Sequence, residues 1–298
     1  MRKFGAYLLA NNRRAGIAAL LFALTPMMMI PLGFVSSVIV GLTTLRKGYK
    51  AGLSVLMFVI LPAVSLIISK HFHLLEAYVM ILIQALLVWV FALILIRTRS
   101  WKWMLEISVL VAVVGIVLIH VFVPNVKEMW LNLMNQYFHS KEWTSMVRMA
   151  NVTQEEIVSY APIATGVIAL VSLFGTFIML LLARWWETTL LQPGLMVREF
   201  VRIRIDRIAS LVLLVASLGL YWRWPWLLDL YPVLLFPFVI AGLSLLHSLV
   251  VWRKQILFLV IVVYITMMLG PVAKYIWLSL AVIGFIDSWY NIRRHYLT

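Results

Sequence analysis

Cysteine is absent from this sequence, and charged residues are scarce. Without cysteine the chain can form neither a disulfide nor a thiolate metal site, and it holds no thiol nucleophile. Only 12% of its 298 residues are charged, whereas 64% are hydrophobic. A soluble domain has about a quarter charged and about half apolar residues. This balance excludes a soluble globular protein and predicts a surface that faces lipid.

Long polar stretches are equally rare, because apolar runs recur along the whole chain. A helix needs about 20 apolar residues to cross the hydrocarbon core of a bilayer. We therefore predict an all-α integral membrane protein, a polytopic bundle of about 8–10 transmembrane segments. The apolar segments are Ala15–Met29, Leu32–Thr44, Ala51–Ser69, Leu74–Ile96, Trp103–Val123, Ile157–Ala183, Ile208–Trp222, Leu230–Trp252, Ile256–Leu269 and Tyr275–Tyr290.

The first two segments are short and meet at Pro26, Pro31 and Gly33. Proline cannot donate a backbone hydrogen bond and breaks a helix. We therefore predict a Pro-broken N-terminal hairpin, or else one strongly kinked helix. Non-helical backbone at membrane depth must be buried in protein or line a cavity, so this region is a candidate ligand site.

Acidic residues are few relative to basic ones, with 11 Asp and Glu against 25 Lys and Arg and a net charge of +14. In a soluble protein this excess would suggest binding to nucleic acid, but in a membrane protein the position of the basic residues is more informative than the net charge. If both termini lie inside, nineteen of the 25 basic residues fall in inside loops, as the positive-inside rule requires. We predict a bacterial inner-membrane protein with cytoplasmic termini, which contacts the lipid bilayer, attracts anionic headgroups and binds no nucleic acid.

The chain divides into three regions. Residues 1–124 hold the N-terminal membrane helices, 125–156 an outer loop, and 157–298 the C-terminal membrane helices. In the outer loop, apolar residues recur at helical spacing, which predicts an amphipathic helix in the membrane interface, either a connector or a lid over an outward-facing cavity. These apolar residues are Val126, Trp130, Leu133, Met134, Tyr137 and Phe138, with Trp143, Met146, Val147 and Ala150 as a weaker repeat.

A basic inner loop spans residues 184–207 and contains the turn signal Gln192-Pro193-Gly194. Val201, Ile203 and Ile205 then alternate with polar residues, which suggests a short strand, although Arg198 and Arg202 are also four apart, as on a helix. The loop is either a solvated basic segment or a docking site for a cytoplasmic partner or anionic headgroups. The candidate docking residues are Arg198, Arg202 and Arg204.

Polar and ionisable residues inside a bilayer are candidates for function. His120 and His247 are either hydrogen-bonded neutral imidazoles between helices or contacts for a ligand or proton. Together with Gln84 and Trp89 in the fourth segment, they form the candidate substrate-binding set.

Enzyme motifs are missing. The sequence holds neither a His-Glu-x-x-His metal helix nor a phosphate-binding glycine loop. Ser244 and His247 are one turn apart, but no oxyanion site or second acid accompanies them. We therefore predict no catalytic residues, no metal site and no cofactor.

Small residues line one face of the first segment, where Ala15, Ala19 and Ala23 are four apart. Small faces let helices approach closely in lipid. This face serves either ordinary packing within the chain or the docking of a membrane partner subunit.

With these residues in view, the chain resembles the YybS-like family of predicted bacterial membrane proteins, whose function is unknown. The resemblance rests on the basic start and Pro-broken hairpin followed by Thr43-Thr44-Leu45-Arg46-Lys47-Gly48, on the order of spans, and on Pro193-Gly194 followed by Arg198-Glu199-Phe200. It implies a distant similarity to the substrate-binding S subunits of energy-coupling-factor transporters. Those subunits dock a coupling subunit through alanines four apart, a pattern that Ala15, Ala19 and Ala23 match.

Two functions follow as hypotheses. The first is binding or transport of a small-molecule ligand, in a pocket built by the broken hairpin and lined by Gln84, Trp89 and His120. The second is a membrane scaffold or assembly factor that contacts protein partners through the inner loop and the outer amphipathic helix. The scarcity of buried polar groups favours the scaffold, whereas the hairpin and the resemblance favour the transporter.

Overall fold

The computed structural model describes residues 2–25, 30–69, 75–138, 154–222, 225–268 and 270–295, and every regular element within them is helical. The chain is an all-α polytopic bundle, as predicted. Six of the described helices are long and apolar enough to cross a membrane, and α13 and α15 are shorter apolar helices. Their bounds are α5 Tyr49–Ser69, α6 Leu75–Thr98, α7 Trp101–Phe122, α11 Ala164–Leu191, α13 Arg207–Tyr221, α14 Pro225–Trp252, α15 Leu257–Met268 and α16 Gly270–Tyr290.

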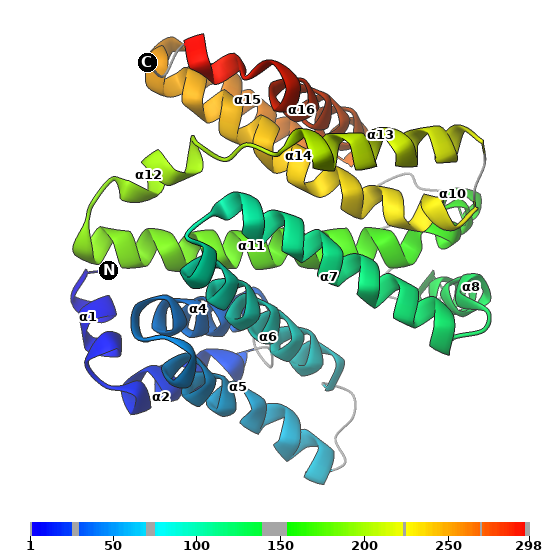
Figure 1. Ribbon diagram of the computed structural model, residues 1–298. Helices are drawn as coiled ribbons and strands as arrows, with labels where there is room; N and C mark the ends of the chain where they lie inside the picture. Colours follow the sequence, from blue (N-terminus) through cyan, green and yellow to red (C-terminus); the bar gives the residue numbers. More distant parts are fainter. Residues whose placement is uncertain are drawn as a thin grey trace.

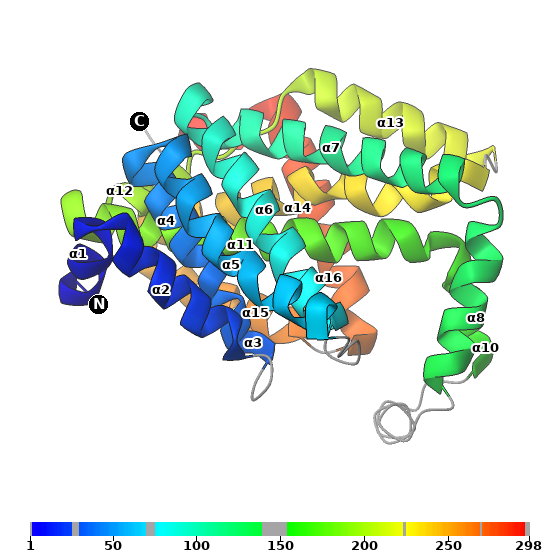
Figure 2. The same ribbon diagram turned by 90° about the horizontal axis from the view of Figure 1, so that it is seen from below.

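The long helices run back and forth along one axis, and both chain termini lie at the same end of the bundle (Figures 1 and 2). We call this end, which also holds the α6–α7 connection and α12 (Leu195–Phe200), the inner end. The opposite end is the outer end. A shared end for both termini agrees with the predicted topology, while the side of the membrane that it faces stays a prediction.

Residues 12–25 and 30–47 form the two arms of a hairpin rather than one kinked helix. It consists of α2 (Asn12–Ala23), α3 (Ile30–Gly33) and α4 (Val35–Lys47). The Lys47 Nζ donates to Asn12 Oδ1 at 2.9 Å, so the hairpin returns to the end where it starts. The 13 residues of α4 extend about 20 Å, which is less than the roughly 30 Å of hydrocarbon. Pro26, where the hairpin was predicted to break, lies outside the described residues.

Helix α4 is enclosed by protein, because α2, α5, α6 and α11 all pack against it. The hydroxyl side chains of α4 are fully buried, and those of Thr43 and Thr44 donate to the carbonyl oxygens of Ile39 and Val40 one turn back. Backbone and hydroxyl groups that meet protein rather than lipid can be satisfied locally. This explains why α4 is less apolar than the long helices.

Helix α11 lies between two halves of the bundle (Figure 1). Its Ala183 and Trp186 belong to an apolar cluster with α2, α4, α5 and α6. Its Phe177 and Leu180 belong to a larger cluster with α6, α7, α14 and α16. The inner end of α11 is therefore held by both halves.

Helix α8 (Val126–Phe138) lies crosswise to the long helices at the outer end (Figure 2). Trp130 Nε1 donates to Thr165 Oγ1 at 2.9 Å and so joins α8 to the start of α11. The predicted helix is confirmed over 126–138, and its weaker repeat at 143–150 lies outside the described residues. The remaining short helices are α1 Arg2–Ala10, α10 Gln154–Ser159, η3 Ala161–Ile163, η4 Lys254–Ile256 and η5 Ile292–His295.

Candidate functional site

Gln84 and Trp89 lie on α6 and join it to neighbouring segments. The Gln84 amide is buried and donates to Thr176 Oγ1 on α11 at 2.9 Å. The Trp89 indole donates to the carbonyl oxygen of Tyr49 at 3.3 Å, and its ring packs beside Gly52. Both side chains therefore connect helices.

His120 lies near the outer end of α7, away from that region. Its Nε2 is 3.5 Å from Asp229 Oδ2, and its Nδ1 is 3.0 Å from the carbonyl oxygen of Ile116. Asp229 is buried and accepts from the backbone N–H of Gly166 at 2.5 Å. A carboxylate at the start of a helix stabilises it, so this cluster caps α11 rather than joining Gln84 in one pocket.

His247 lies towards the inner end of α14, where its ring packs edge to face against Phe200 and Tyr264. Its Nδ1 is 2.8 Å from the carbonyl oxygen of Leu243. The neighbouring Ser244 hydroxyl donates to the carbonyl oxygen of Phe200 at 2.5 Å and accepts from Arg293 at 2.9 Å. These contacts fasten the inner loop to α14.

The small-residue face of α2 points into the protein. Ala15, Ala19 and Ala23 are each at most 1% exposed, and α2 packs on α4 and α5. A partner subunit could reach this face only after α2 had separated from the bundle.

The inner loop combines a short helix with an extended segment. The short strand suggested by the spacing of Val201, Ile203 and Ile205 is absent from this described segment, which forms a turn and irregular backbone, although all three side chains are buried. Arg204 is half-buried and donates to the carbonyl oxygens of Asp287 and Ser288, so it caps the end of α16. Arg198 and Arg202 remain exposed.

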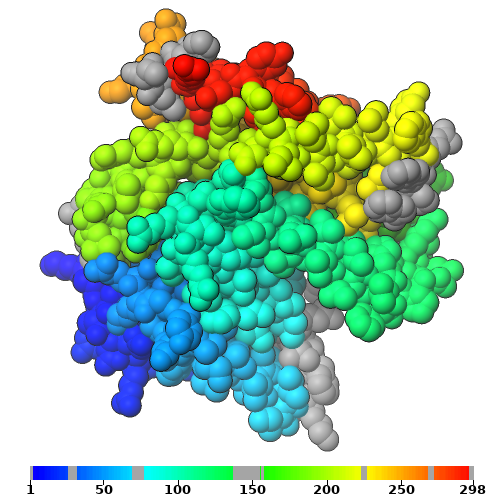
Figure 3. All heavy atoms as spheres, viewed as in Figure 1, coloured from blue at the N-terminus to red at the C-terminus, as the bar shows by residue number. Residues whose placement is uncertain are grey.

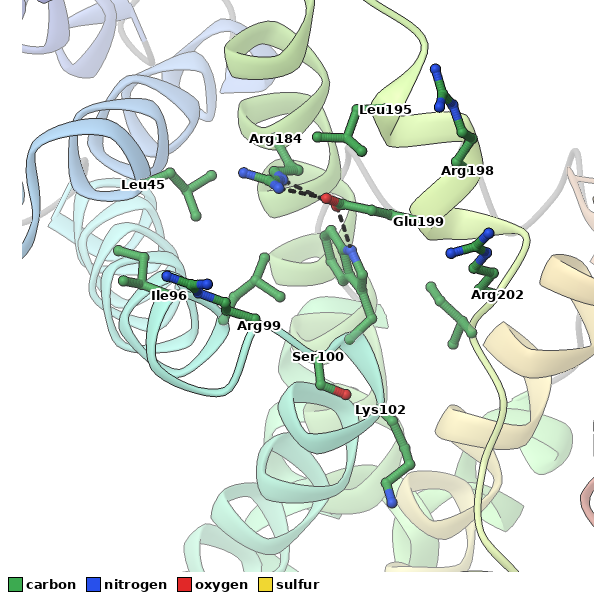
Figure 4. A pocket seen from close by; sticks show the side chains of 13 residues that line it. Leu45, Ile96, Arg99, Ser100, Lys102, Arg184, Leu195, Arg198, Glu199 and Arg202 are labelled. Atoms are coloured by element: carbon green, nitrogen blue, oxygen red, sulfur yellow. Dashed lines mark hydrogen bonds and ion pairs between the residues drawn. The ribbon is translucent and has the colours of Figure 1, made fainter. Parts of the chain in front are cut away.

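A basic pocket of about 680 Å³ opens at the inner end, between the ends of α4 and α6, the start of α7, the end of α11, and α12 (Figure 4). In the space-filling view, the inner loop lies directly beside the α6–α7 connection (Figure 3). Ligand sites are typically clefts of about 300–1,000 Å³. The pocket is lined by Leu45, Leu95, Ile96, Arg99, Ser100, Trp101, Lys102, Arg184, Leu195, Arg198, Glu199, Arg202 and Ile203.

The carboxylate of Glu199 occupies the centre of this pocket (Figure 4). It accepts from Arg184 Nε at 3.0 Å and Nη2 at 2.5 Å, and from Trp101 Nε1 at 3.1 Å. Arg184 also donates to Glu187 at 2.7 Å. Burial alone would raise the pKa of Glu199, but the bonds from Arg184 and Trp101 outweigh it and hold the pKa below its ordinary value. Glu199 is therefore ionised at neutral pH.

Cations outnumber acids around this centre. Lys102 pairs with Asp206, the residue before α13. Arg99, Arg198 and Arg202 form no ion pair with any of the described residues, and all three are exposed. Arg99 and Arg202 stand on opposite sides of the pocket, whereas Arg198 points away from its centre (Figure 4). The pocket thus presents positive charge that no carboxylate of the described segments neutralises.

Arg99 adopts a left-handed backbone conformation, with φ of 51°. It follows α6, and its N–H donates to the carbonyl oxygen of Leu95. Glycine usually takes this position at a helix end, because a side chain there is strained. Strained residues concentrate at functional sites, so an arginine in place of glycine points to a role for its guanidinium.

We expect Arg99→Gly to stabilise the fold slightly and to weaken anion binding. Relief of the strain is worth up to about 1 kcal/mol, partly offset by the greater freedom of glycine in the unfolded chain. Unfolding in detergent measures the first effect, and lipid binding the second. Arg99→Ala is the control, since it removes the guanidinium and keeps the strain. A glycine variant less stable than the alanine variant would contradict this explanation.

Sequence reasoning found Arg198 and Arg202 but missed Arg99, Trp101, Lys102, Arg184 and Glu199. None of these five was named as a candidate site residue. The available signal was Glu199, an acid that directly follows Arg198 in the basic inner loop. Within the described part of the chain, no group of three or more His, Asp or Glu side chains could hold a metal ion.

Comparison with protein-family models, curated proteins and solved structures finds no match.

Proposed function

We propose that this polytopic membrane protein binds an anionic ligand in the basic pocket at its inner end. The observation that carries the proposal is the pair Arg99 and Arg202, which line a cavity of about 680 Å³ on opposite sides and form no ion pair with any described carboxylate. Arginine is well suited to such a role, because its fork of donors matches the oxygens of a carboxylate or phosphate. Leu45, Leu95 and Ile96 add an apolar wall, so the ligand is an amphiphile.

The position of the pocket supports a ligand at headgroup level. It lies where the membrane helices α6, α7 and α11 end or begin, and the exposed Trp103 and Trp185 belong to two of these helix ends. Indoles settle at the membrane interface. By the positive-inside rule this interface is the cytoplasmic one, and in a bacterium it belongs to the inner membrane.

Transport, the activity expected from the resemblance, would need a path through the bundle. Gln84 bonds to Thr176 across α6 and α11, and Phe174 and Phe177 pack against Phe236 of α14. These contacts join α6 to α11 and α11 to α14 in the middle of the bundle. We therefore propose binding at the inner end, by a receptor or lipid-regulated membrane protein, as the activity that the geometry supports best.

The test compares lipid binding by the purified protein with that of two double variants. In Arg99→Gln/Arg202→Gln we expect phosphatidylglycerol in nanodiscs to bind at least about tenfold more weakly, because two charge-assisted hydrogen bonds are lost. The matched control is Arg253→Gln/Lys254→Gln, which removes two exposed inner-end charges outside the pocket. Bound lipid is counted by native mass spectrometry.

An equal loss in both double variants would mean that a diffuse positive surface attracts the lipid. No loss in either would mean that the pocket holds no anion. Either result overturns the proposal.

A further inference from the structure

The Glu199 carboxylate is bound in the way that proteins bind a ligand oxyanion. Arg184 donates to both of its oxygens, and Trp101 Nε1 donates to one of them. Such paired donors from arginine are characteristic of carboxylate and phosphate recognition. The basic pocket therefore already contains an anion, and that anion belongs to the chain itself.

We infer that Glu199 is a tethered competitor whose place on Arg184 is taken by the terminal phosphate of a phosphomonoester ligand. This inference rests on the proposed function and names the ligand class and its internal inhibitor. Glu199 lines the pocket and is only partly buried. Its side chain can therefore leave Arg184 for solvent without disturbing the bond between Ser244 and Phe200 that anchors α12.

The balance of charge favours a dianion over a monoanion. Once Glu199 has turned away, four cations of the pocket remain against two carboxylates, because Arg198 points away from its centre. The cations are Arg99, Lys102, Arg184 and Arg202, and the carboxylates are Glu187 and Asp206. A phosphodiester carries one negative charge, whereas a phosphomonoester carries nearly two at neutral pH. Only the monoester approaches neutralisation of this excess.

Arg184 remains positioned in both states. Its Nη1 donates to Glu187, which is 8% exposed and does not line the pocket. Nε and Nη2 are the two nitrogens that Glu199 occupies. When Glu199 leaves, both nitrogens face the cavity while Glu187 still fixes the guanidinium plane.

The experiment measures three ligands against the unmodified protein, Glu199→Gln and Glu187→Gln in phosphatidylcholine nanodiscs. The ligands are phosphatidic acid, a monoester lipid; phosphatidylglycerol, a diester lipid; and soluble glycerol 3-phosphate. Glu199→Gln removes the competing charge but keeps an oxygen that can accept from Trp101. Glu187→Gln removes one charge from the same arginine outside the pocket but keeps an amide oxygen that can accept from Arg184 Nη1. Arg184 therefore stays positioned, and this variant controls for a general rise in positive potential.

We expect the unmodified protein to bind phosphatidic acid about tenfold tighter than phosphatidylglycerol, and Glu199→Gln to tighten phosphatidic acid binding by about tenfold more than Glu187→Gln does. Affinity for phosphatidic acid should also rise severalfold as pH increases through about 6, where the monoester gains its second charge. If glycerol 3-phosphate competes with phosphatidic acid, the natural phosphomonoester is a soluble ligand. If it does not compete, the phosphomonoester is a lipid.

Equal affinity for the two lipids in the unmodified protein would overturn the inference, as would equal effects of Glu199→Gln and Glu187→Gln. The lipid comparison needs no variant, so it decides even if Glu199→Gln fails to fold. If the inference is overturned but anionic lipid binding still requires Arg99 and Arg202, the proposed function stands.

Discussion

Replacement of Arg293 by methionine is expected to destabilise the protein by about 3–5 kcal/mol, the usual effect of breaking a buried ion pair. Arg293 is 5% exposed and its partner Asp287 is fully buried. Its guanidinium donates to Asp287 Oδ2 at 3.1 Å and to the carbonyl oxygens of Val201 and Ala241. Burial lowers the pKa of Arg293, an effect that Asp287 opposes. Methionine fills the space but leaves the carboxylate without its countercharge.

The free energy of unfolding in detergent, followed by far-UV circular dichroism, measures this loss. Arg294→Met is the control, since the adjacent Arg294 is exposed and forms no ion pair with the described residues. The double variant Asp287→Ala/Arg293→Met should lose clearly less than the sum of the two single losses, because it removes both charges. Strict additivity would show that the two side chains act independently.

The Arg293 network also holds the segment that carries Glu199 at the end of the helix bundle. Arg293 and Ser244 bond to the carbonyl oxygens of Val201 and Phe200, the residues that follow Glu199. Arg204 bonds to the end of α16 on the far side of the same segment. A binding site gains from residues whose own positions are fixed by surrounding bonds. We expect the loss of Arg293 therefore to weaken ligand binding as well as the fold.

The sequence predicted the helices well because length and composition decide them. Each long apolar run forms a helix, although some helix ends differ from those predicted. Helices α14 and α16 begin at Pro225 and Gly270, before the predicted Leu230 and Tyr275, and α11 begins at Ala164 and continues past Ala183 to Leu191. The added turns contain Arg184 and Glu187, which charge alone had assigned to a loop. The ion pair between Arg184 and Glu187 allows the helix to continue, because each charge has a partner within the helix.

The pocket could not be predicted, because it depends on pairs far apart in the chain. Trp101 and Glu199 are separated by 98 residues, and Lys102 and Asp206 by 104. One sequence reports which residues are polar, but it does not report which helix faces which. The same limit applies to Gln84, whose partner Thr176 lies 92 residues away. A polar residue in an apolar helix identifies a contact to another helix before it identifies a ligand.

Gly284→Ala is expected to destabilise the bundle by about 2 kcal/mol, although alanine favours a helix by about 1 kcal/mol relative to glycine. Helices α14 and α16 touch backbone to backbone at this point. A Cβ on Gly284 would overlap the carbonyl oxygen of Phe238, and one on Gly242 would overlap that of Leu280. Backbone atoms cannot rotate away as side chains do, so the helices must separate along their contact. Unfolding in detergent measures the effect.

Gly115→Ala is the matched control, because it makes the same change in the membrane helix α7 at a position where nothing lies within 4 Å of the new Cβ. At this position only the helix preference of alanine acts, and it should stabilise the folded protein by up to about 1 kcal/mol. The two variants share their chemistry and differ only in the neighbour. If the changes in the free energy of unfolding have opposite signs, the effect comes from the α14–α16 contact. If they have the same sign, the two helices separate at this contact without cost.

The contact that holds α14 against α16 also keeps Ser244 and Asp287 in reach of Arg293. The small residues of the membrane core and the charged network at the inner end therefore stabilise the same arrangement.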